Sequence, residues 1–242
     1  MELKMNRLKI LAGQLDIQLS DEQLEQFQIY YDMLIEKNKV MNLTAITQLD
    51  EVITKHFLDS IALASVYQNI KEDELKIIDL GTGAGFPGIP LKIVFPQLKI
   101  TLMDSLNKRI VFLQSVIEKL QLSGIEAIHG RAEEMAKKKE YRETYDLCVS
   151  RAVSNLSTLS EYCLPFVRID GKFISYKASE IEEELENSRK AIKLLGGKLS
   201  TVNKITLPES DIQRSFVIID KIEKTSKTYP RKPGTAAKEP IK

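Results

Sequence analysis

The sequence predicts an α/β fold in which a doubly wound, mostly parallel sheet follows a helical N-terminal extension. From residue 76 onward, short apolar runs alternate with amphipathic stretches, a pattern that favours parallel strands joined by right-handed helical crossovers. Before residue 70 the apolar residues recur at spacings of three and four, and no convincing strand is present. We therefore expect a helical extension over 1–70, a core over 71–225 and a tail over 226–242.

The N-terminal extension is expected to contain two helical stretches. Ser20 is followed by acidic residues and precedes a periodic apolar series, as is typical of a helix N-cap. The apolar positions of this first stretch are Leu24, Phe27, Tyr31, Leu34 and Ile35. In the second stretch His56 shares a helix face with Phe57 and lies near Asp59, so we expect a structural hydrogen bond rather than catalysis.

The core is expected to form a seven-stranded sheet. The predicted strands are 76–80, 99–104, 125–129, 145–150, 172–176, 198–206 and 214–223. The predicted helices are 87–95, 107–121, 154–164 and 179–195, the last of them ended by Gly196 and Gly197. Only a turn separates the last two strands, so the hairpin that they form adds one antiparallel strand.

The amino-acid composition limits the possible classes of protein but does not identify a partner. The 242 residues are 43% hydrophobic, enough for a sizeable core, and 35 basic residues balance 34 acidic ones. No apolar run reaches the roughly 18 residues that span a membrane. We expect a cytoplasmic monomer in which Cys148 and Cys163 are reduced, and no residue set has metal-ligand spacing.

The glycine-rich segment Gly81-Thr-Gly-Ala-Gly85 lies at the first βα turn, where doubly wound sheets bind their ligands. So many glycines indicate that a ligand approaches the main chain closely. The glycines at 83, 85 and 88 match the dinucleotide spacing, but Asp79 in the preceding strand would repel a pyrophosphate. The pattern from Asp79 to Gly85 looks like the first motif of Rossmann-like S-adenosylmethionine-dependent methyltransferases, whose cofactor is cationic. A nucleotide-dependent oxidoreductase is the alternative.

Two further strand ends carry candidate cofactor residues. Asp104 ends the second strand, where a carboxylate can accept both ribose hydroxyls, although it could also cap the next helix. Ala132 and Glu133 follow the third strand, where an adenine would lie in this architecture. The alternative for Glu133 is a favourable charge at a helix N-terminus.

The end of the fourth strand, Val149-Ser-Arg-Ala-Val153, is where the methyl group and its acceptor would meet. It lacks the Pro-Pro-aromatic motif of amino-methylating enzymes, and Cys163 has the wrong spacing for cytosine-C5 chemistry. A ring nitrogen such as guanine N7 needs neither device, because it already presents a lone pair. Positioning the guanine against the sulfonium methyl could supply most of the catalysis, since such orientation lowers the activation barrier by about 7–11 kcal/mol in favourable systems. No catalytic residue is identified, and Arg151 could hold the cofactor, the guanine or a phosphate.

The C-terminal tail is basic and is expected to be a loop or a segment that becomes ordered on binding. Residues 221–242 hold seven lysine or arginine residues against two glutamates. Tyr229, Arg231 and Lys232 are interleaved with proline and glycine, which suits base stacking and phosphate contact. We expect this tail to bind RNA independently of the cofactor loops, with a second RNA footprint around Arg109 and Lys177. The alternative is a merely solvated surface.

Seven segments together resemble the RsmG family of 16S ribosomal RNA guanine-N7 methyltransferases, formerly called glucose-inhibited division protein B. The segments are NLTAI, KHFLDS, DLGTGAGFPGIPLKI, DSLNKRIVFLQ, GRAEE, SRAV and YPRKPG. The resemblance runs from about residue 20 to the C-terminus. It implies S-adenosylmethionine as cofactor and methylation of a guanine near the decoding region of 16S rRNA, within the small subunit or its precursor.

By the family pattern, the cofactor contacts fall on Gly81, Phe86, Ala132, Glu133 and Arg151. To these the motif reading adds Gly83 and Asp104. One departure is Lys177-Ala178, where family members often have Lys-Gly. A third hypothesis is a non-catalytic RNA-binding module that retains the methyltransferase fold.

Overall fold

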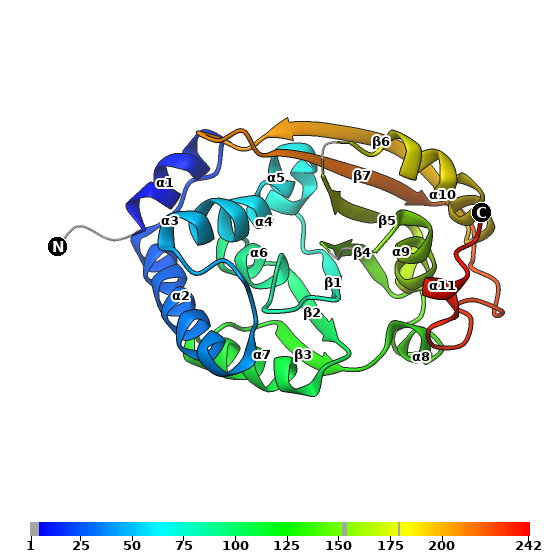
Figure 1. The fold of residues 1–242 in the computed structure, drawn as a ribbon, viewed down its shortest axis with the longest axis horizontal. Helices are drawn as coiled ribbons and strands as arrows, with labels where there is room; N and C mark the ends of the chain where they lie inside the picture. Colours follow the sequence, from blue (N-terminus) through cyan, green and yellow to red (C-terminus); the bar gives the residue numbers. More distant parts are fainter. Residues whose placement is uncertain (1–4, 152–153, 179) are drawn as a thin grey trace.

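The computed structural model describes residues 5–151, 154–178 and 180–242 and is built around a seven-stranded sheet (Figure 1). The strands are β1 Lys76–Leu80, β2 Lys99–Asp104, β3 Ile125–His129, β4 Tyr145–Ser150, β5 Val167–Lys177, β6 Gly197–Thr206 and β7 Gln213–Lys221. Their order is β3-β2-β1-β4-β5-β7-β6; β1 to β5 run parallel, and β7 runs antiparallel to both β5 and β6. The predicted fold class is confirmed, including the hairpin that adds the antiparallel strand.

Helices cover both faces of the sheet. Those of the N-terminal extension are α1 Asn6–Gly13, α2 Asp21–Met41, α3 Leu49–Val52, a π-helical segment Ile53–Leu58, α4 Asp59–Ile61, α5 Leu63–Val66 and a 3₁₀ turn Gln68–Lys71. Those that follow are α6 Gly88–Val94, α7 Asn107–Lys119, α8 Ala132–Met135, α9 Leu156–Cys163, a 3₁₀ turn Leu164–Phe166, α10 Glu182–Leu194 and α11 Thr235–Lys238. Two regions of the predictions, Ala152-Val153 in the SRAV segment and Ser179 at a predicted helix start, lie outside the described residues.

The N-terminal helices share a hydrophobic cluster with one face of the sheet. Ser20 caps α2 as predicted, because its hydroxyl accepts from the Gln23 N–H at 3.1 Å while the Gln23 side chain accepts from the Ser20 N–H at 2.9 Å. Buried residues of α1 and α2 pack in the same cluster as Ile77, Ile100 and residues of α6 and α7. Alternate strand residues, such as Ile78, face a second cluster under α9 and α10. The extension therefore packs directly behind the first βα turn.

The tail is ordered against the core rather than lying free. It runs beside α8 and α9 (Figure 1), and the Arg142 guanidinium donates to the carbonyls of Thr225, Ser226 and Tyr229 at 2.7–3.1 Å. The prediction of a loop missed the four-residue helix α11, which is too short to show periodicity. Long-range packing, which no local pattern reveals, gives the tail its shape.

Three expectations about special features can be compared with the described residues. None of their helices is long and apolar enough to cross a membrane. Cys148 and Cys163 are both free and buried. In this part of the chain no three His, Cys, Asp or Glu side chains gather in a way that could hold a metal ion.

Candidate active site

The loop between β1 and α6 is held from behind by a buried carboxylate. Asp79 is fully buried, and its Oδ2 accepts from the Thr82 hydroxyl at 2.6 Å and from the Gly88 N–H at 2.9 Å. Burial raises the pKa of Asp79 from 3.8 to about 6. Asp79 thus fixes the shape of the loop and the start of α6.

The loop glycines serve two different needs. A Cβ on Gly85 would lie 2.7 Å from both Ile89 Cδ1 and Tyr30 Oη, and one on Gly88 would lie 2.2 Å from Leu102 Cδ2. These two glycines are required by close packing. Gly83 has φ +63°, and a Cβ there would meet nothing within 4 Å. Its open side is therefore available to a ligand that lies against the main chain.

Helix α2 supports this loop through Tyr30, which the sequence analysis did not single out. The Tyr30 hydroxyl donates to the Ala84 carbonyl at 2.5 Å, and its ring lies 5.5 Å from the rings of Phe57 and Phe86. Tyr30 is fully buried, whereas the predicted Tyr31 is only half-buried. A shift of one residue along the helix separates these two positions.

A cavity of about 320 Å³ lies beside the loop at the carboxyl ends of β1, β2 and β4. It brings together four of the predicted cofactor residues, Gly81, Asp104, Ala132 and Glu133. The other lining residues are Leu80, Met103, Ser105, Gly130, Arg131, Ser150, Ser154, Leu159, Tyr162 and Cys163. Its size falls within the usual range for small-molecule sites. Gly83, Phe86 and Arg151 are not among the lining residues.

Asp104 connects this cavity to the glycine loop. Its carboxylate accepts from the Gly83 N–H at 3.0 Å and from the Leu106 N–H at 2.9 Å, just before α7. Arg109, which we predicted as an RNA contact, pairs with Asp104 at 3.0 Å. The carboxylate is only 3% exposed, so Arg109 neutralises a buried charge at the cavity wall.

Glu133 connects the cavity to the tail. It is buried, and its Oε1 accepts from the Gly234 N–H at 3.0 Å. Nearby, the Arg231 guanidinium forms an ion pair with the Glu161 carboxylate of α9 at 2.7 Å, and Glu161 is only 1% exposed. The expectation that the tail stands apart from the cofactor loops is therefore wrong. Tyr229 is half-buried, and Lys232 is exposed.

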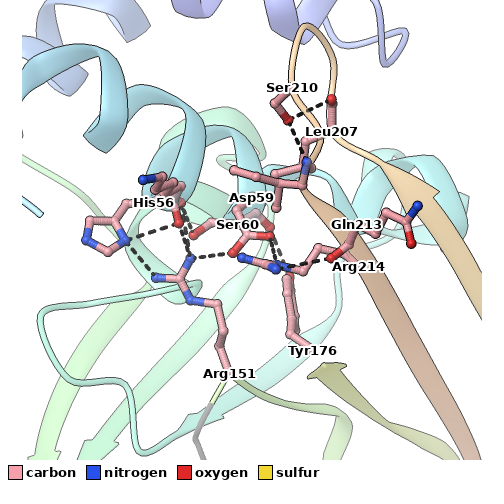
Figure 2. A network of polar contacts seen from close by, with 11 residues as sticks. His56, Asp59, Ser60, Arg151, Tyr176, Leu207, Ser210, Gln213 and Arg214 are labelled. Atoms are coloured by element: carbon pink, nitrogen blue, oxygen red, sulfur yellow. Dashed lines mark hydrogen bonds and ion pairs between the residues drawn. The ribbon is translucent and has the colours of Figure 1, made fainter. Parts of the chain in front are cut away.

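Arg151 turns toward the N-terminal extension, where it belongs to a polar network. Its Nη1 donates to Asp59 Oδ2 at 2.8 Å and to the Lys55 carbonyl at 3.1 Å, and its guanidinium carbon lies 5.0 Å from the Phe86 ring centroid. Figure 2 shows Asp59 between Arg151 and a second arginine, Arg214, whose Nε donates to Asp59 Oδ1 at 2.7 Å. Neither Asp59 nor Arg214 was predicted as a partner of Arg151.

These arginines lie on a second cavity of about 420 Å³. Lys177 also lines it, and its Nζ contacts Glu184 Oε1 and the Ser154 carbonyl, each at 2.6 Å. Ser154 lines both cavities, so the two are neighbours beyond the end of β4.

His56 makes hydrogen-bond contacts within the N-terminal extension, and its structural role stays a prediction. Its Nε2 lies 2.8 Å from the Thr44 hydroxyl, its Nδ1 lies 3.1 Å from the Lys55 carbonyl, and its ring stacks on Phe86 at 4.6 Å. Burial, together with the Arg151 guanidinium, lowers the pKa of His56 from 6.5 to about 4. The ring is therefore neutral at pH 7. His129 is exposed and contacts the Ser105 carbonyl at 3.0 Å.

Known proteins are similar to this chain in sequence over most of its length. It is 51% identical to the ribosomal RNA small subunit methyltransferase G of Alkaliphilus metalliredigens over the whole of both chains. The relative of the same name from Lachnoclostridium phytofermentans is 53% identical over 94% of this chain and 93% of its own length.

Two solved structures share the fold at low sequence identity. One is TrmN from Thermus thermophilus. The superposition covers 70% of this chain and 53% of TrmN, with a TM-score of 0.51 and 12% sequence identity. The other is M. jannaschii TYW2, solved in complex with AdoMet. This superposition covers 68% of this chain and 77% of TYW2, with a TM-score of 0.52 and 15% sequence identity. The profile of rRNA small subunit methyltransferase G matches residues 23–217. The chain therefore belongs to the rRNA small subunit methyltransferase G family.

Proposed function

We propose that this rRNA methyltransferase transfers a methyl group from S-adenosylmethionine to N7 of a guanine in the decoding-region loop of 16S rRNA. The substrate would be the small ribosomal subunit or its precursor, in the cytoplasm. The observation that carries the proposal is the pair of neighbouring cavities that share Ser154, one beside the glycine loop and one lined by Arg151, Lys177 and Arg214.

The residues of the first cavity fit S-adenosylmethionine. Gly83 leaves open space beside the main chain, and Asp104 can accept the ribose hydroxyls while it holds the Gly83 N–H. Asp104 and Glu133 are the two carboxylates of the lining, against one arginine, Arg131, so the lining itself carries a net negative charge that favours a cationic ligand over a pyrophosphate. When bound, S-adenosylmethionine supplies a methyl group activated by the sulfonium. We propose Gly81, Gly83, Asp104, Ala132 and Glu133 as its binding residues, with Phe86 and Arg151 supporting the loop from the other side.

Asp104→Ala should weaken S-adenosylmethionine binding by on the order of 10- to 150-fold, because a hydrogen bond to a charged acceptor contributes about 1.5–3 kcal/mol. Calorimetric titration of the purified protein measures this loss. Arg109→Ala serves as the control, since it removes the counter-ion of Asp104 and leaves the carboxylate in place. Unchanged affinity in Asp104→Ala would exclude Asp104 from the ribose contact.

The methyl transfer would rest on positioning. Guanine N7 carries no proton, so no general base has to accept one. His56 has both ring nitrogens engaged, and its lowered pKa makes it a weak proton acceptor near neutral pH. The chain contributes by holding the cofactor in the first cavity and the guanine beside it, with water excluded between them.

Single-turnover rates of His56→Ala, His129→Ala and Cys163→Ser should therefore stay within about 10³-fold of the parent rate when cofactor and RNA binding are intact. The rates are measured with saturating enzyme on small ribosomal subunits. A larger loss in one variant, with both affinities preserved, would have the size of acid–base or nucleophilic catalysis. It would contradict the positioning mechanism.

RNA contacts are proposed for Lys177 at the second cavity and for Tyr229 and Lys232 in the tail. Arg109 and Arg231 each have a buried carboxylate partner, so we propose that they hold Asp104 and the tail in place. The test of the whole proposal is to map N7-methylguanine in 16S rRNA from cells with and without this protein. Loss of one modified guanine supports it. Binding of NAD in preference to S-adenosylmethionine, or binding of subunits without methyl transfer, would favour one of the two other hypotheses.

A further inference from the structure

One buried carboxylate serves two arginines at the second cavity. Asp59 is 1% exposed, and each of its oxygens accepts from a different guanidinium, Oδ2 from Arg151 and Oδ1 from Arg214. The cluster of these three side chains (Figure 2), here called the Arg–Asp–Arg cluster, therefore carries one excess positive charge. A charge that is partly removed from water and lacks a partner is costly, so a bound anion would stabilise the cluster.

The two arginines differ in how many donors remain free. Arg151 donates to the carbonyls of Lys55 and His56 as well as to Asp59. Arg214 uses Nε on Asp59 and Nη1 on the Gln213 carbonyl at 3.2 Å; its Nη2 makes no hydrogen bond to the residues that the structure describes. Its side chain is 24% exposed and lines the second cavity. Arg214 is thus the member of the cluster that can take a further acceptor.

No carboxylate of the cavity lining is paired with Arg214 in the part of the chain that the structure describes. Lys177 and Glu184 neutralise each other at 2.6 Å, and Glu180 is exposed to solvent. The planar fork of an arginine matches the geometry of a phosphate, and arginine is favoured wherever phosphates are recognised. Because the cavity adjoins the cofactor cavity at Ser154, an RNA nucleotide placed for methylation would bring its own phosphates to this wall.

We propose that Arg214 binds a backbone phosphate of the RNA next to the target nucleotide, and that Asp59 is the positioning residue that holds Arg214 and Arg151 side by side. This inference rests on the proposed function and adds a residue to it. Asp59 lies in the N-terminal extension and Arg214 at the start of β7, so the extension and the hairpin together build the site.

The test compares Arg214→Ala with Arg168→Ala in binding to small ribosomal subunits over a range of salt concentrations. Arg168 also pairs with an aspartate, Asp146 at 2.6 Å, but at the amino-terminal end of β5, so this control removes the same charge elsewhere. For Arg214→Ala we expect an affinity loss on the order of 10-fold and a salt slope lower by about 0.7. The affinity for S-adenosylmethionine should not change. Arg214→Lys should retain the slope, because it keeps the charge.

Asp59→Asn tests the positioning role, since it keeps the shape of the side chain and removes its charge. We expect the Michaelis constant for subunits to rise as in Arg214→Ala, with the single-turnover rate at saturating subunits nearly unchanged. Combining Asp59→Asn with Arg214→Ala should add little to either single change, because both act through Arg214.

An Arg214→Ala slope equal to that of Arg168→Ala would overturn the inference, as would a loss of S-adenosylmethionine affinity with subunit binding intact. If Asp59→Asn does not fold, the Arg214 variants still decide the question. Methyl transfer by the parent protein is measured in parallel. If the parent protein transfers the methyl group and the salt slope of Arg214→Ala is unchanged, only the phosphate-binding role of Arg214 is contradicted. If the parent protein transfers no methyl group, both the proposed function and this inference are contradicted.

Discussion

Gly83→Val should reduce S-adenosylmethionine binding by at least about 100-fold, while the protein still folds. The positive φ of +63° disfavours a β-branched residue, by roughly 1–2 kcal/mol in the left-handed region. The added Cβ itself would meet no protein atom within 4 Å, so we expect the fold to tolerate it. Its branched methyl groups would instead occupy the open space beside the loop, where the cofactor would lie. Calorimetry measures the binding loss, and thermal unfolding without ligand measures the strain.

Two matched variants separate the causes. Gly83→Ala imposes much of the same backbone strain with a smaller side chain, so it should lose less affinity than the valine variant. Gly13→Val also adds a side chain into open space, in α1, and should leave binding unchanged. If Gly83→Val binds S-adenosylmethionine as the parent protein does, the loop does not hold the cofactor.

The sheet was predictable because its signals are local. The four strands β1 to β4 have the predicted bounds, since each is a short apolar run with turn or helix signals on both sides. Strand β5 begins earlier than predicted, at Val167, in a segment where Asp170 and Gly171 suggest a turn. There a shift in the pairing with β4 between Tyr145 and Leu147 lets the chain remain in the sheet. Pairing with a neighbouring strand overrides the local preference.

The grouping of residues around the first cavity was also accessible to sequence reasoning, because parallel strands place their carboxyl ends at one edge of the sheet. Gly81, Asp104 and Glu133 come from three such ends and line one cavity. The pairing at the second cavity was not accessible. Asp59 and Arg214 are 155 residues apart in the chain, and neither stands in a pattern that points to the other. Only the packing of the extension against the hairpin brings them together.

The C-terminal tail shows the same limit of sequence reasoning, because a residue predicted to contact RNA has a partner inside the protein. Its composition suggested a surface that binds RNA, and a run of lysine, arginine and proline carries no sign of an internal partner. The partner of Arg231 is Glu161, 70 residues earlier in the chain on α9. Thr158 adds a second link, since its hydroxyl donates to the Ala236 carbonyl at 3.0 Å. Composition could therefore not distinguish a free arginine from an anchoring one.

Arg231→Ala should destabilise the protein and weaken S-adenosylmethionine binding together. Removing one partner of a buried ion pair costs about 3–5 kcal/mol. We expect the lower end, because Arg231 is 25% exposed and its main-chain N–H would still donate to Glu161 at 2.8 Å. Loosening the tail would also release the Gly234 N–H from Glu133, at the wall of the first cavity, where we propose that the cofactor binds. Denaturant unfolding and calorimetry measure the two effects.

Lys232→Ala is the matched control for this prediction, because it removes the same charge from the next residue, which is exposed. It should leave stability and S-adenosylmethionine affinity unchanged and should weaken subunit binding, with a salt slope lower by about 0.7. Arg231→Ala combined with Glu161→Ala should be less destabilised than Arg231→Ala alone, because no buried charge is then left without its partner. The opposite pattern for Arg231→Ala, with normal stability and cofactor affinity and weaker subunit binding, would make Arg231 an RNA contact. The Arg231–Glu161 pair would then have little part in holding the tail.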